Sequence, residues 1–321
     1  MKEGTHKLMT LDFWLICISN FLLYSGVWTL LPVLSAEGYL FGLDRFNMMV
    51  TILLFVVAMI GIGPLHAYLG DAYRRNHVLM ASTIGLGLCA FGSTMVTQMW
   101  QLCTLTTVAG ALFGIATTAG ITVAIDITKS QRRDAGNRIY AFSGAMGLLV
   151  GLCLLSKLYL VMDYQQLVYE ALVLWAGCLM AESCVYVPFR APEGVGLLNL
   201  DRFFLPNAWL PAINVCVLAL GIGMTTSLLP PYTWICTVAL LALTVGVVPL
   251  TKMFVKLSHH CRRGTANTTL QLAMMTGLLV GMVVGEFVEN ALIISLVTIL
   301  ISLLALPLIT LPYFHKKRVR K

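Results

Sequence analysis

Three polar side chains in the first apolar segment, Asn20, Tyr24 and Trp28, are spaced four residues apart. On an α-helix this spacing places them on one face. An amide and a phenol can exchange hydrogen bonds with an organic solute, and an indole can stack on it. The same face would also suit an interhelical hydrogen bond at Asn20 and aromatic rings at a membrane interface. Our working interpretation is the wall of a solute cavity.

Further polar residues occur inside later apolar segments. Asn214 is a second candidate for the cavity wall, because a lone amide in lipid needs a partner. Thr107 and Thr237 lie in two other segments and could face the same cavity, although the glycines and threonines around Thr107 also suit close helix packing. Glu182, near one end of its segment, is a candidate coupling acid. No acidic residue lies clearly at mid-depth, which favours a neutral or lipophilic solute.

Two short basic stretches resemble each other. The residues Arg-Arg-Asp-Ala-Gly-Asn at 132–137 are echoed by Arg-Arg-Gly-Thr-Ala-Asn at 262–267. Arginine forks bind carboxylates and helix C-termini, so such loops could hold a gate shut on one side of a membrane. Alternatively, the charges only set topology. The candidate gate residues are Asp71, Arg74, Arg75, Arg132, Arg133, Arg262 and Arg263.

The composition excludes several classes of protein. Hydrophobic residues make up 59% of the chain and charged residues 11%, which is incompatible with a soluble domain. The net charge of +7 sits in short loops between apolar segments, so it does not indicate nucleic-acid binding. The adjacent residues 259–261, His-His-Cys, lack further ligands for a metal, and neither a phosphate-binding loop nor a catalytic pair occurs. We therefore expect no cofactor and no enzyme activity.

Ten apolar segments are long enough to cross a membrane, and helices are the default because lipid offers the backbone no other partner. Basic residues follow every second segment, which places both termini in the cytoplasm. The segments are Phe13–Leu34, Met48–Leu65, Val78–Val96, Leu102–Ile125, Tyr140–Met162, Leu167–Val187, Asn207–Leu229, Tyr232–Val255, Thr268–Gly285 and Ala291–Tyr313.

The chain divides into two unequal halves. Residues 1–188 hold six segments, residues 189–206 form a cytoplasmic linker with proline and glycine, and residues 207–321 hold four segments. From Asp12 to Arg132 is 120 residues, whereas the corresponding interval from Asp201 to Arg262 is 61 residues. The second half is therefore short by about one helical hairpin.

This organisation resembles the major facilitator superfamily. The Arg-rich loop at 132–137 ahead of Gly144, Gly147 and Gly151 is similar to the connection before that family's fifth helix. The stretch 63–76, with Asp71 ahead of its Arg pair, sits where the family carries its motif between the second and third helices. Details of both motifs are similar to a branch from Bacteroidetes-type bacteria. The resemblance implies an all-α, polytopic inner-membrane bundle whose halves rock around a central site in alternating access.

Two departures qualify what the resemblance implies. The fourth helix lacks the arginine common in proton-coupled members, and the shortage would correspond to the family's eighth and ninth helices. The expected function is a secondary transporter for a small solute, in contact with membrane lipid. Self-association, or a partner that fills the missing hairpin, would compensate for the shortage. The alternative is a non-transporting scaffold or partner subunit derived from the same fold.

Overall fold

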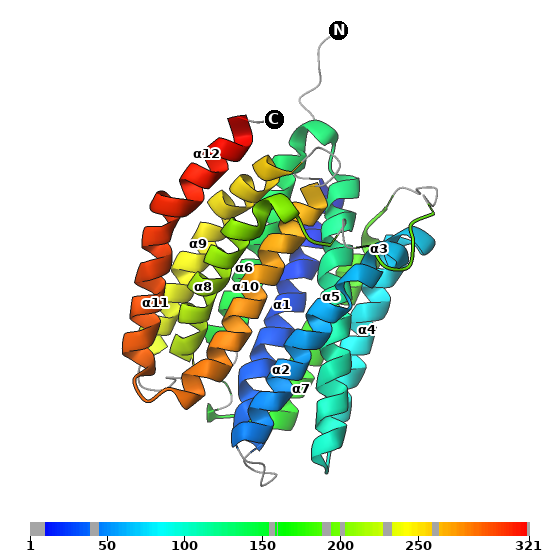
Figure 1. The fold of residues 1–321 in the computed structure, drawn as a ribbon. Helices are drawn as coiled ribbons and strands as arrows, with labels where there is room; N and C mark the ends of the chain where they lie inside the picture. Colours follow the sequence, from blue (N-terminus) through cyan, green and yellow to red (C-terminus); the bar gives the residue numbers. More distant parts are fainter. Residues whose placement is uncertain are drawn as a thin grey trace.

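The computed structural model describes residues 10–38, 45–153, 158, 160–187, 194–199, 203–226, 233–258 and 263–319. Within these residues every regular element is a helix, as expected from the sequence. The helices run side by side in one bundle, and the start of α1 and the end of α12 lie at the same end of it (Figure 1). The assignment of that end to the cytoplasm stays a prediction from the charge pattern.

The helices form two sets along the chain. The first helical set comprises α1 (Leu11–Gly38), α2 (Arg45–Gly61), α3 (Gly63–Ala72), α4 (Arg75–Ser93), α5 (Met99–Ile127), α6 (Arg133–Cys153) and α7 (Tyr164–Cys184). The second helical set comprises α8 (Trp209–Thr226), α9 (Thr233–Leu257), α10 (Arg263–Phe287), α11 (Ala291–Ala305) and α12 (Leu311–Val319).

Seven spans of the described chain are long and apolar enough to cross a membrane, and the bent pair α2–α3 makes an eighth. The helices α4 and α6 lie in the same bundle and are less apolar than these spans. In addition, α6 begins with the charged residues Arg133 and Asp134. The predicted number of ten crossings therefore stays a prediction.

Two expected segments are broken in the structure. The segment predicted as one run at 48–65 bends by about 40° between α2 and α3, where Pro64 occupies the first turn of α3. Proline lacks an N–H and cannot continue the ladder of the preceding turn. The last segment is interrupted after α11 by a π-helical turn, Leu306–Thr310, which contains Pro307. The sequence analysis did not foresee either break.

Glycines set the distance between α1 and α6. A Cβ added at Gly147, which lies 126 residues after Phe21, would come within 3 Å of the Phe21 carbonyl oxygen. A Cβ at Gly151 would meet the carbonyl oxygen of Ser25 in the same way, one helical turn further along. Only glycine permits two helix backbones to approach this closely.

The helices α8 and α10 repeat this contact. A Cβ at Gly277, 61 residues after Cys216, would overlap the Cys216 carbonyl oxygen, and one at Gly281 would overlap that of Leu220. Both glycine pairs begin fourteen residues after the first residue of their helix, which is an arginine in α6 and in α10. The two basic loops noted in the sequence therefore introduce equivalent helices.

The packing extends this equivalence to the remaining helices. The helix α1 packs on α6 and α7 as α8 packs on α10 and α11, while α2 contacts α10 and α9 contacts α6 across the two sets. Among the described helices, α4 and α5 have no counterpart in the second set. By these contacts α9 corresponds to α2, the second helix of the first set, whereas the expectation placed the missing hairpin at the second and third helices of the second set; the missing hairpin itself stays a prediction.

Substituting alanine for Gly277 should destabilise the protein, because its methyl group would push the α8 backbone away from α10. We expect a loss of about 1–3 kcal/mol, visible as a lower midpoint of thermal unfolding in detergent. Gly246→Ala is the matched control, because a Cβ at Gly246 on α9 meets no atom within 4 Å. Equal midpoints for the two variants would contradict the packing role.

Candidate functional site

A small pocket lies where α1, α2 and α5 meet α10. Its volume is about 20 Å³, enough for roughly one water molecule. One wall comes from the first helical set and the other from α10 and the chain before α8, so the pocket lies at the contact between the two sets. We call it the central pocket. Its lining residues are Tyr24, Met59, Phe113, Gly114, Thr117, Thr118, Phe203, Thr268, Gln271, Leu272 and Met275.

The central pocket combines a mainly apolar surface with a few uncharged polar side chains. Hydroxyl groups of Thr117, Thr118 and Thr268 and the amide of Gln271 border it, and its lining contains no acidic or basic side chain. Aromatic and thioether groups complete the wall. Such a lining suits an uncharged solute that carries both hydrogen-bonding groups and an apolar surface.

Tyr24 is the residue of the predicted α1 face that borders this pocket. Its ring meets the edge of Phe113, with centroids 5.2 Å apart, and the side chain is 1% exposed. Among the residues that the structure describes, the Tyr24 hydroxyl has no hydrogen-bond partner. A buried hydroxyl without a partner costs about 1–3 kcal/mol of folding free energy. This group could therefore form a further hydrogen bond at the contact between the sets.

The other two residues of that face lie against α6. Asn20 donates from Nδ2 to the Tyr140 carbonyl oxygen at 2.9 Å and to Ser143 Oγ at 3.1 Å, while its Oδ1 has no partner in the described part of the chain. Trp28 is fully buried beside Gly151, and no described residue accepts a hydrogen bond from its Nε1. The face therefore packs over the glycines of α6 and carries three unsatisfied polar atoms in a row.

Three other predicted cavity residues lie outside the central-pocket lining. Asn214 joins α8 to the end of α11, since its Nδ2 donates to Thr310 Oγ1 at 3.2 Å and its Oδ1 accepts from Ser302 Oγ at 2.8 Å. Thr107 donates to a carbonyl of its own helix, and Thr237 is half-buried on α9. The Asn214 amide thus has hydrogen-bond partners, as expected for an amide in lipid, and they lie within its own helical set.

The sequence analysis missed residues from α10. Gln271 and Thr268, 7% and 6% exposed, bring the polar groups of the second helical set to the central pocket. A glutamine inside an apolar segment is a signal in itself, because an amide in lipid is costly. Its place opposite Thr118 follows only from the way in which α10 packs on α2 and α5.

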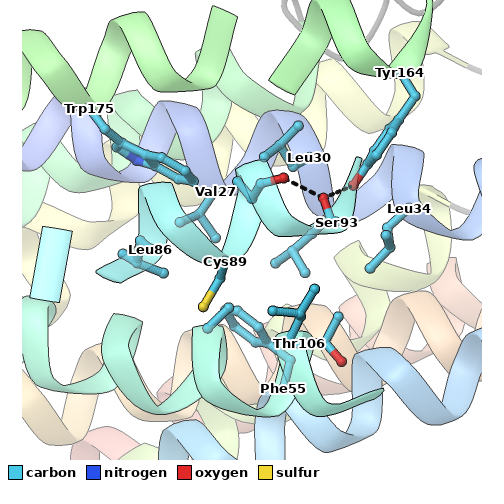
Figure 2. A pocket seen from close by; sticks show the side chains of 14 residues that line it. Val27, Leu30, Leu34, Phe55, Leu86, Cys89, Ser93, Thr106, Tyr164 and Trp175 are labelled. Atoms are coloured by element: carbon cyan, nitrogen blue, oxygen red, sulfur yellow. Dashed lines mark hydrogen bonds between the residues drawn. The ribbon is translucent and has the colours of Figure 1, made fainter. Parts of the chain in front are cut away.

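A second pocket, of about 60 Å³, lies inside the first helical set and is shown in Figure 2. Its walls are almost entirely apolar, with Phe55, Leu86 and Trp175 around the space. Ser93 Oγ lies 2.8 Å from the hydroxyl of Tyr164 and also donates to the Ala90 carbonyl oxygen (Figure 2). Its polar groups are thus engaged with each other and with the backbone, unlike Tyr24.

Glu182 is fully buried between α1, α4 and α7. Its Oε1 accepts hydrogen bonds from Ser19 Oγ at 2.9 Å, Thr83 Oγ1 at 3.3 Å and Cys178 Sγ at 3.2 Å. Its Oε2 has no partner, and within the described residues no basic side chain pairs with it. The carboxyl group is therefore embedded in the first helical set, at a distance from the lining of the central pocket.

The predicted gate arginines that carry an interaction act within the first helical set. Arg75, at the start of α4, forms an ion pair with Asp126 at the end of α5, and its Nε donates to the Gly70 carbonyl oxygen at 3.2 Å. Arg133 Nε donates to the Thr128 carbonyl oxygen at 3.3 Å and so caps α5. Sequence analysis did not single out Asp126.

The acidic gate residue contacts the linker. Asp71 Oδ2 accepts a hydrogen bond from the backbone N–H of Val195 at 2.9 Å, which ties residues 194–199 to α3. Arg74 and Arg132 are exposed to solvent. Of the last two predicted gate residues, Arg262 and the side chain of Arg263 lie outside the described part of the chain.

Comparisons with known proteins agree with this architecture. A family profile for the Major Facilitator Superfamily matches residues 15–316. A sequence comparison with curated proteins gives no match. Among solved structures, the human organic anion transporter MFSD10 (TETRAN) is similar with a TM-score of 0.60 at 12% identity, covering 92% of this chain and 97% of its own.

The nucleoside transporter NupG, as its D323A mutant, is similar with a TM-score of 0.59 at 12% identity, covering 92% of this chain and 98% of its own. At this identity the likeness concerns the fold. The family match covers nearly the whole chain and agrees with the all-helical bundle. The chain belongs to the major facilitator superfamily of secondary transporters.

Proposed function

We propose that this protein moves a small, uncharged solute across the inner membrane by alternating access, with the central pocket as the solute site. The observation that carries the proposal is the buried Tyr24 hydroxyl, which has no hydrogen-bond partner among the described residues, in a side chain that borders the pocket between the two helical sets. Buried polar groups nearly always have a partner, and here a solute or water would supply it. Asn20 Oδ1 and Trp28 Nε1 extend the same unsatisfied face.

The moving parts in this proposal are residues 1–188 and 207–321, joined by the linker at 189–206. A pocket of about 20 Å³ holds no organic solute, so binding requires the two sets to separate. In this closed conformation, two hydrogen bonds from backbone N–H groups attach the linker region to the helices. Asn199 N–H donates to the Pro64 carbonyl oxygen at 3.0 Å, and Leu205 N–H donates to Thr269 Oγ1 at 2.9 Å. Together with the Asp71–Val195 contact, they are the latch that we propose opens during transport.

The lining favours one class of solute over another. An organic anion would need a cationic partner in a buried site, and the central pocket offers none. A neutral compound with hydroxyl groups and a ring, as in a nucleoside, could bond to Gln271 and the threonines and stack on Phe113 or Tyr24. Of the two structural neighbours, the nucleoside transporter therefore gives the better guide to the solute.

Glu182 is the candidate coupling acid in this scheme. Three donors converge on one of its oxygens and the other oxygen is free to carry a proton. Its contacts join α1 to α4 and α7, so a change in its protonation would act on the position of α1. In this role it would position Tyr24 from a distance and would not touch the solute.

A non-transporting scaffold is the alternative function. The observation in its favour is the tight contact between the two sets, at which the central pocket has a volume of only about 20 Å³. A scaffold would keep that contact closed permanently, whereas a transporter must open it. Access to Tyr24 therefore separates the two functions.

Removing one hydroxyl from the central pocket should weaken solute binding. We expect nucleosides, in preference to organic anions, to raise the unfolding temperature of the purified protein, and Thr118→Val to weaken the apparent affinity about 10-fold. Thr107→Val is the matched control, because both hydroxyls bond to their own helix and Thr118 alone borders the pocket. An equal loss in both variants would contradict the proposed site.

A cysteine at position 24 should report alternating access. In a variant without other cysteines, we expect Tyr24→Cys to react with an impermeant maleimide added from either side of the membrane. Leu23→Cys, equally buried and outside the pocket lining, should react from neither side. If Tyr24→Cys reacts from neither side, in a protein shown to be folded, the result would favour the scaffold.

A further inference from the structure

A large groove lies between α8, α9 and α11, away from the central pocket. Its volume is about 420 Å³, within the usual range of ligand pockets. Leu218 and Ile222 of α8 form its floor, with Leu243 of α9 and Leu303 of α11 on its walls. Leu303 is also 51% exposed, so the groove opens outward from the bundle. We call it the lateral groove.

The lateral groove lies where the second helical set has no counterpart of α4 and α5. In the first set α5 covers α2 and α4 covers α7. The equivalent sides of α9 and α11 stay uncovered among the described helices, and they expose Leu241 and Val245 on α9 and Leu300 and Leu304 on α11. Figure 1 shows α11 and α12 at the edge of the bundle. Within a bilayer, an apolar space of this kind is filled by a lipid acyl chain or by apolar side chains of another protein.

The surface of the groove leaves little for a polar solute to bind. Its two uncharged polar side chains, Asn214 and Ser302, are hydrogen-bonded to each other. The remaining polar side chains are Lys252 and Lys256, one turn apart near the end of α9. Both are exposed, and in the described part of the chain neither is paired with an acidic residue.

We propose that the lateral groove binds one anionic phospholipid. An acyl chain would lie between α9 and α11, and the phosphate would sit on the ammonium groups of Lys252 and Lys256. The two lysines favour an anionic lipid over an uncharged one, because paired cations at the end of an apolar groove attract a negatively charged headgroup. A second copy or a partner hairpin would have to bring an acidic side chain to these lysines, whereas an anionic lipid carries its negative charge in the headgroup. The proposal does not depend on the identity of the transported solute.

Native mass spectrometry of the detergent-purified full chain tests this, with phosphatidylglycerol and phosphatidylcholine of the same acyl chains as probes. We expect the wild-type protein to bind phosphatidylglycerol more tightly. The double variant Lys252→Gln/Lys256→Gln should weaken that binding by about 30-fold, the effect of two lysine–anion attractions, and leave phosphatidylcholine unchanged. The control is Lys129→Gln/Lys316→Gln, which removes the same charge outside the groove lining and should change neither affinity.

A second variant tests the apolar part of the groove. Gly246→Phe should fill it without strain, because a Cβ at Gly246 meets no atom within 4 Å, and should weaken the binding of both lipids. Equal binding of the two lipids by the wild-type protein would overturn the proposal. An equal loss of phosphatidylglycerol affinity in the two double-lysine variants would overturn it as well. So would a dimer that Gly246→Phe dissociates, since the groove would then hold a second copy.

Discussion

The close approach of backbones at two glycine ridges is the constraint on which this structure depends. Gly147 and Gly151 bring α6 onto α1, and Gly277 and Gly281 bring α10 onto α8. In lipid there is no hydrophobic force between helices, so association relies on close van der Waals contact and on interhelical hydrogen bonds. Glycine at these positions allows both. The central pair in each helical set is fixed this way, and the other helices pack around it.

This packing also explains why the predicted face of α1 is only partly available. Because α6 approaches so closely, Asn20 and Trp28 are buried against it, and Asn20 uses one end of its amide on the α6 backbone. Tyr24 lies between them and reaches the contact with the second set. Along this face the closed, tightly packed protein still has donor and acceptor groups that lack a hydrogen-bond partner among the described residues.

The unequal size of the two sets has a consequence at the surface. Where α4 and α5 shield the first set, the second set exposes the sides of α9 and α11 and encloses a groove between them. The arginines at the starts of α4 and α6 serve the first set's own helices: Arg75 holds α4 to α5 through Asp126, and Arg133 caps α5. The lysines beside the groove have no such protein partner in the described residues, which is why a lipid headgroup suits them.

The sequence alone determined the all-helical membrane fold, the family and the repeat between the two basic loops. These depend on local properties, namely the length of apolar runs and the spacing of Arg-Arg-x-x-x-Asn ahead of glycines. Tertiary structure decided the rest. Gln271 and Thr118 are 153 residues apart in the chain and meet only because α10 packs on α2 and α5. Asn214 looked equivalent to Asn20 in the sequence, yet it bonds to α11. The period of a helix reveals which residues share a face, but only the packing of the other helices decides what that face meets.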